Sequence, residues 1–188
     1  MSERARERFL WVAAIVVVAV LVHIGSVYMV PRLVMARALA AMGAPNTMRY
    51  PKRPDATARA IVMPSPDLLY STCPFDLSKG PLRVHARVPH STYWSVSAFD
   101  AATNNFFVRN DRQIAGNSIE ILLVRPGMAW PALDDAVERV ILFAPTDKGL
   151  ILFRLLIDDD KHLSALDAIR RHSSCTTVHP IASAHGLR

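Results

Sequence analysis

The sequence predicts a mainly β domain, an antiparallel sandwich or barrel, that follows one N-terminal transmembrane helix and contains one helix near its end. Three observations lead to this class. Residues 9–30 carry no charge, and six or so later segments are apolar or alternate with a period of two. No helical pattern separates those segments, as the βαβ alternation of a parallel sheet would require.

The first segment, FLWVAAIVVVAVLVHIGSVYMV at residues 9–30, is long enough to cross a bilayer of about 30 Å. It lacks the polar stripe of a helix that packs in a soluble core. A cleaved signal peptide has a shorter apolar stretch and a small-residue cleavage site close behind it. Here the nearest Ala-x-Ala lies at residues 38–40, beyond Pro31. We therefore expect an uncleaved anchor, with cleavage as the alternative.

The flanks of this segment predict its orientation. Arg4, Arg6 and Arg8 stand directly before it, whereas the basic residues behind it are more widely spaced. Cytoplasmic flanks are enriched in Arg and Lys. We expect residues 1–8 in the cytoplasm, residues 9–30 in the bilayer and the bulk of the chain outside.

Residues 31–60 predict a stalk and a linker. The sequence PRLVMARALAAM at residues 31–42 is helical in composition, and Gly43 and Pro45 are typical of a helix end. Prolines punctuate residues 46–60, as in an extended linker. The β domain is then expected over residues 61–179, and residues 180–188 form a tail.

The strands of the domain follow one another with short breaks. The clearest alternates Leu82, Val84 and Ala86 with polar side chains. The expected strands are residues 61–71, 82–88, 92–99, 106–109, 118–125, 139–144 and 150–157. The loop PTDKG at residues 145–149 predicts a hairpin between the last two. Residues 159–172 predict a helix with Leu163 and Ile169 on its apolar face.

The chain has two cysteines, Cys73 and Cys175. An even pair in one extracytoplasmic domain favours a disulfide, which would tie the beginning of the domain to its end. Neither cysteine has a second one at Cys-x-x-Cys spacing, so a zinc site is not expected.

The residues that could carry chemistry form no recognisable catalytic pattern. There is no Gly-x-Ser-x-Gly elbow, no histidine pair at metal-ligand spacing within the domain and no glycine-rich phosphate loop. Acidic and amide side chains on loops could hold a cation, but turn-stabilising hydrogen bonds are their commoner use. Aromatic side chains on the strands could line a ligand site or fill the core. The expected ligand or partner surface comprises Asp67, Tyr70, Tyr93, Trp94, Asn104 and Asn105, with no catalytic residue, metal or cofactor.

Four phrases together are more specific than this pattern. SPDLLYST (65–72), FDLSKGPLRV (75–84), YWSVSAFDAATNNFFVRND (93–111) and GLILFRLLI (149–157) resemble the bacterial family of domain of unknown function 1254. The resemblance implies a jelly-roll-like β-sandwich. It also implies that larger relatives carry a second domain, numbered 1214, which this short anchored form lacks. A companion protein that bears the second domain is therefore an expected partner.

Taken together, the sequence predicts an envelope interaction or assembly module of the bacterial inner membrane, with its bulk in the periplasm. The alternative is a binder or carrier of a small apolar or lipid-like ligand, and a hydrolase is the least favoured reading. The net charge of +6 comes from scattered arginines. Without a nucleic-acid-binding module, that charge does not predict nucleic acid as a partner.

Overall fold

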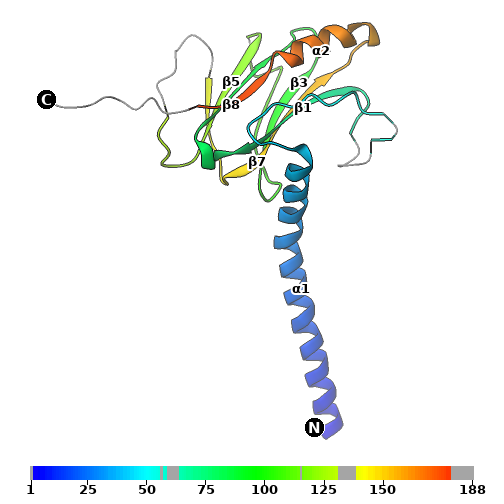
Figure 1. The fold of residues 1–188 in the computed structure, drawn as a ribbon. Helices are drawn as coiled ribbons and strands as arrows, with labels where there is room; N and C mark the ends of the chain where they lie inside the picture. Colours follow the sequence, from blue (N-terminus) through cyan, green and yellow to red (C-terminus); the bar gives the residue numbers. More distant parts are fainter. Residues whose placement is uncertain (1, 56, 59–63, 115, 131–138, 179–188) are drawn as a thin grey trace, which may run out of the picture.

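The computed structural model describes residues 2–55, 57–58, 64–114, 116–130 and 139–178. Two four-stranded sheets form a β-sandwich, and a long helix projects from one end of it (Figure 1). The predicted fold class, a sandwich with an N-terminal and a C-terminal helix, is confirmed. In chain order the elements are α1 (Glu3–Met42), β1 (Leu68–Asp76), η1 (Leu77–Lys79), β2 (Leu82–Arg87), β3 (Trp94–Asp100), β4 (Asn105–Asn110), β5 (Ser118–Val124), β6 (Arg139–Phe143), β7 (Lys148–Leu156), η2 (Asp160–His162), α2 (Leu163–Arg171) and β8 (Ser174–Thr177).

The two sheets have the strand orders β1-β7-β3-β4 and β6-β5-β2-β8. Every pair is antiparallel except β5 and β6, which run parallel. The predicted hairpin between β6 and β7 is wrong, because these strands belong to different sheets. The loop between them carries the chain from one sheet to the other, with Ala144 still bonded to Val124 and Asp147 bonded to Leu77. The short strand β8 was not expected, and residues 61–63 of the expected first strand lie outside the described residues.

Alternating side chains of the two sheets meet in the core. On β2 the apolar side chains point inward, and the polar ones between them are exposed or half-buried, as the sequence predicts. On β3, Trp94, Val96 and Ala98 are buried, and Val96 lies opposite Phe153 of β7. The helix α2 adds the buried Leu166 at the edge of this core.

Helix α1 runs without a break through Pro31, so the predicted stalk is part of the same helix. Its apolar N-terminal part is exposed along its whole length. Near its C-terminal end, Met35 is buried and Leu39 and Met42 are half-buried. These positions share one face at helical spacing, and α1 contacts β7 there. The last turns of the helix are therefore packed against the domain.

The segment that follows α1 closes one side of the sandwich. The backbone N–H of Asn46 donates to Pro74 O, and its side-chain amide donates to Asp76 O and Thr177 Oγ1 at 2.9 and 3.0 Å. Asp76 N donates in return to Asn46 Oδ1. One asparagine thus joins β1 of the first sheet to β8 of the second. The Tyr50 hydroxyl donates to Ser173 O on the same side.

The two cysteines lie on the strands that this segment joins. Cys73 of β1 and Cys175 of β8 are at disulfide distance, with their Cα atoms 6.4 Å apart and 102 positions apart in sequence. Both side chains are buried. The cross-link and the Asn46 contacts therefore hold the same pair of sheet edges together.

A buried carboxylate lies on the outer face of the second sheet. Glu120 of β5 is 0% exposed. Its Oε2 accepts from Arg83 at 2.6 Å, and its Oε1 accepts from Arg139 at 2.6 Å. These contacts tie the three strands β2, β5 and β6 together. Burial raises the pKa of the Glu120 carboxyl, but the hydrogen bonds and charges of the two arginines outweigh this effect and leave its pKa below the ordinary value.

This network predicts an acid-dependent loss of stability. A carboxylate whose folded pKa is depressed contributes stability above its unfolded pKa, and the contribution disappears as the pH falls through the folded pKa. We expect the free energy of unfolding of the native protein to decrease as the pH drops below about 4.5. Glu120→Gln should weaken this pH dependence and should lower the free energy of unfolding at neutral pH by about 2 kcal/mol. Urea unfolding at a series of pH values measures both. An unchanged acid slope in Glu120→Gln would show that other carboxylates control it.

Candidate functional site

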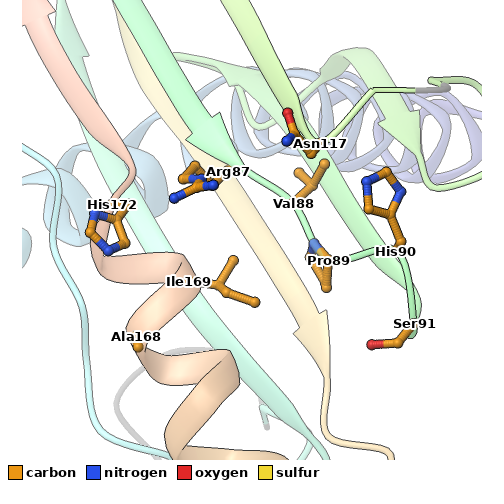
Figure 2. Close-up of a pocket in the computed structure, with 9 residues that line it drawn as sticks. All are labelled: Arg87, Val88, Pro89, His90, Ser91, Asn117, Ala168, Ile169 and His172. Carbon is orange, nitrogen blue, oxygen red and sulfur yellow. The ribbon is translucent and has the colours of Figure 1, made fainter.

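A cavity lies at the end of the sandwich farthest from α1. It has a volume of about 430 Å³. The loop between β2 and β3 forms one wall, and the C-terminal end of α2 forms the other (Figure 2). The direction of β2 explains this position, because β2 begins near the C-terminal end of α1 and ends at the cavity.

The lining combines an apolar floor with one arginine and two histidines. Val88, Pro89 and Ile169 supply the apolar part. Arg87, at the last position of β2, lies toward His172 in the view of Figure 2, with His90 across the cavity. Among the described residues, no carboxylate lines the cavity. Its chemistry therefore suits a ligand that carries both a negative charge and an apolar portion.

Local hydrogen bonds hold both walls in place. Val88 N donates to the backbone oxygen of Asn117, which fixes the loop after β2 against the segment before β5. On the other wall, Arg170 is 2% exposed and donates to Tyr70 O at 2.5 Å, which fixes α2 to the first sheet. Asp167 accepts from Arg170 and Arg171. This carboxylate is therefore neutralised by its own helix.

Three of the six residues predicted as a ligand or partner surface lie at this end of the domain but do not line the cavity. Asp67 precedes β1 and is exposed, and its backbone oxygen accepts from Ile157. Tyr93 is 41% exposed, and its backbone oxygen accepts from Leu156. Tyr70 follows on β1, where its hydroxyl accepts from Ser65 N at 2.9 Å.

The other three predicted residues lie elsewhere. Trp94 is 3% exposed and packs in the core, so it adds nothing to the accessible surface. Asn104 lies in the turn between β3 and β4 and Asn105 is the first residue of β4, at the opposite end of the sheet. Asp100 accepts there from the backbone N–H groups of Ala102 and Asn104 and from the Asn104 amide. These are turn-stabilising contacts, and the six residues do not converge on one site.

The described residues include no cluster of three or more His, Cys, Asp or Glu side chains placed to hold a metal ion. Sequence reasoning missed the basic residues of the cavity, Arg87, His90 and His172. Each is ordinary in its local context, and they come from two segments that only the fold brings together, the end of β2 with its following loop and the end of α2.

Helix α1 is the one described helix that is long and apolar enough to span a membrane. The most apolar stretch of 18 residues has a mean hydropathy of 2.6, and none of it is buried. A membrane anchor and a signal sequence both have such a helix near the N-terminus.

Two solved structures are similar to this chain, and the first of them shares its fold. The VPA0106 protein from Vibrio parahaemolyticus matches with a TM-score of 0.60 at 12% identity, over 81% of this chain and 35% of that one. A putative uncharacterized protein from Burkholderia cenocepacia matches with a TM-score of 0.48 at 17% identity, over 87% of this chain and 44% of that one. The chain therefore spans about a third of the length of the Vibrio protein. No curated protein matches the chain.

The sequence comparison with protein families is more specific. The family described as "Protein of unknown function (DUF1254)" matches residues 45–177, which comprise the strands, the cysteine pair and both walls of the cavity. The predicted resemblance is thus confirmed, and the chain belongs to the DUF1254 family.

Proposed function

We propose that this protein is a membrane-anchored interaction or assembly module of the bacterial cell envelope, which acts beside a companion protein. The observation that carries the proposal is an apolar surface on strand β6. Trp130, Ile141 and Phe143 form this β6 surface, and their side chains are 38%, 46% and 52% exposed. Clustered exposed apolar side chains are typical of interaction sites.

The β6 surface has the geometry of a docking site. Val140 and Leu142 point toward the core, which places Ile141 and Phe143 on the outer face of the sheet. The Trp130 ring packs edge-on against Phe143, with ring centroids 6.2 Å apart. Within the described part of the chain, β6 is also the edge of its sheet, since only β5 pairs with it. An apolar face beside an open strand edge favours a polypeptide partner that adds a strand.

The length of the relatives supports a particular occupant. The chain matches 35% of the Vibrio protein, so most of that protein lies outside the match. We propose that the β6 surface binds a companion polypeptide equivalent to that remaining part, the second domain of the larger relatives. The opposite side of the sandwich is less suitable, because Asn46 and the paired cysteines already close it.

The proposed location is the bacterial inner membrane, with the N-terminus inside and the domain in the periplasm. The apolar α1 supports the anchor, and Arg4, Arg6 and Arg8 before it support the orientation. The cysteine pair at disulfide distance suits an oxidising compartment. The intact mass of the membrane-extracted protein tests the anchor, because cleavage of a signal sequence would remove the mass of the N-terminal segment.

Site-specific photocrosslinking in native membranes tests the docking surface. A photoreactive phenylalanine analogue at position 143 is expected to trap the companion polypeptide. The same analogue at position 93, an aromatic site of similar exposure at the other end of the domain, is expected to trap none. Phe143→Glu should abolish co-purification of the companion, and Tyr93→Glu should leave it unchanged. An adduct with lipid, an adduct with a second copy of the chain, or no adduct at position 143 would refute the proposal.

A further inference from the structure

We infer that the cavity between the β2–β3 loop and α2 binds a small organic anion with an apolar body, and that Arg87 holds its acidic group. This inference does not depend on the β6 surface. It rests on the charge, the lining and the position of the cavity.

Among the described residues that line the cavity, Arg87 is the one with a permanent charge. Arg87, His90 and His172 line it, and the described residues place no carboxylate among them. Several other arginines of the domain are held by carboxylates, as Arg83 is by Glu120 and Arg125 by Asp147. The Arg87 side chain has no hydrogen bond or ion pair within the described chain, although it lines a cavity. A planar guanidinium that is free to bond in two places is well suited to a carboxylate or phosphate.

The rest of the cavity explains why the ligand needs an apolar portion. Val88, Pro89 and Ile169 form its floor, and Val88 and Pro89 are buried. A volume of about 430 Å³ falls at the lower end of the range for small-molecule sites. Asn117 and Ser91 add uncharged polar groups at the rim. The combination fits one acidic group on a short hydrocarbon chain better than a fully polar metabolite.

The end of α2 does not oppose this assignment. Helix C-terminal carbonyls carry partial negative charge, but here the last of them are bonded. Ile169 O accepts from His172 N at 3.1 Å, and Arg170 O accepts from Ser173 N at 3.0 Å. The acidic Asp167 of the same helix is held by Arg170 and Arg171. The anion therefore meets no free negative group from this wall.

The position of the cavity indicates the source of the ligand. Helix α2, which forms one wall of the cavity, lies at the end of the sandwich away from α1 (Figure 1), so the headgroups of the bilayer in which we propose that α1 lies are out of reach. The acidic group therefore belongs to a soluble molecule, such as a medium-chain carboxylic acid, rather than to a bilayer lipid.

Binding of octanoate to the full chain in phosphatidylcholine nanodiscs tests the inference, with octanol as the neutral probe of equal chain length. Calorimetry or ligand-observed NMR should show saturable octanoate binding and at least tenfold weaker octanol binding. Arg87→Gln should weaken octanoate binding at least tenfold. Arg112→Gln, at an exposed arginine before β5, should leave it unchanged. Ala168→Trp, which fills the cavity from the exposed face of α2, should block binding without removing a charge.

The opposite results are equally clear. Equal affinity for octanoate and octanol would show that Arg87 does not bind the carboxylate of the ligand. Unchanged octanoate binding in both Arg87→Gln and Ala168→Trp would place the ligand elsewhere. Binding of the chain to added phosphatidylglycerol vesicles without octanoate binding would assign the anion to lipid headgroups and overturn the inference. Phe143→Glu is expected to bind octanoate normally, so failure of the β6 proposal and failure of this one are distinguishable.

Discussion

Replacement of both cysteines by alanine, Cys73→Ala with Cys175→Ala, is expected to lower the free energy of unfolding by about 4 kcal/mol. The two residues are 102 positions apart, so a cross-link between them restricts nearly the whole domain in the unfolded state. The cross-link also joins the two sheets on the side where Asn46 bridges β1 and β8. Urea unfolding, followed by the fluorescence of the buried Trp94, measures the loss.

The wild-type protein under reducing conditions is the matched control for this variant. Reduction should cost the wild-type protein a similar free energy and should not affect the double variant. Thiol labelling provides a direct check, because neither cysteine should react in unreduced, denatured protein. Full labelling of both would show that the cross-link does not form.

The second large effect is expected at Gly149. This residue lies in β7, between Phe75 of β1 and Asp100 of β3. A Cβ atom there would collide with the carbonyl oxygen of Phe99 and would lie 2.5 Å from Cζ of Phe75. Gly149→Ala must therefore push apart two neighbouring strands at the centre of the sheet. We expect a loss of about 3 kcal/mol in the free energy of unfolding.

Gly116→Ala is the control for this substitution. A Cβ at Gly116 would meet its nearest neighbour, Ser118 O, at the ordinary contact distance of 3.7 Å. We expect this variant to stay within about 0.5 kcal/mol of wild type. If the urea midpoints of the two variants coincide, the steric argument at Gly149 is wrong.

The fold was predictable where the information is local. The alternation of Leu82, Val84 and Ala86 with polar residues predicts the buried face of β2. The helical spacing of apolar residues around Leu166 predicts the buried face of α2. The pairing of strands was not predictable in the same way, because β6 and β7 are joined by a turn-like loop yet pair with different sheets. Turn chemistry describes the loop, whereas the partner of a strand depends on residues far away in sequence.

The candidate site depends even more on distant residues. Arg87, His90 and His172 come together only because α2 returns to the end of β2. Glu120 is a similar case, since a charge within an apolar strand reveals nothing of the two arginines that pair with it. Conversely, Trp94 was predicted as a surface candidate from its residue type, and the inward face of β3 places it in the core.

Helix α1 continues without a break into the turns around Met35 and Leu39 that pack against the domain. The domain therefore has no flexible joint between itself and the membrane segment that we propose. At 1.5 Å per residue, residues 31–42 extend about 18 Å beyond the apolar segment. A membrane-bound companion would then find the β6 surface at one fixed height above the bilayer. The two proteins would meet through lateral diffusion in the membrane and through rotation of each about its helix axis. One extra residue in the stalk would lift the domain by about 1.5 Å but turn it by about 100°. Because spin about the helix axis compensates for that turn, the height of the β6 surface, rather than its angle, would limit which stalk lengths support assembly.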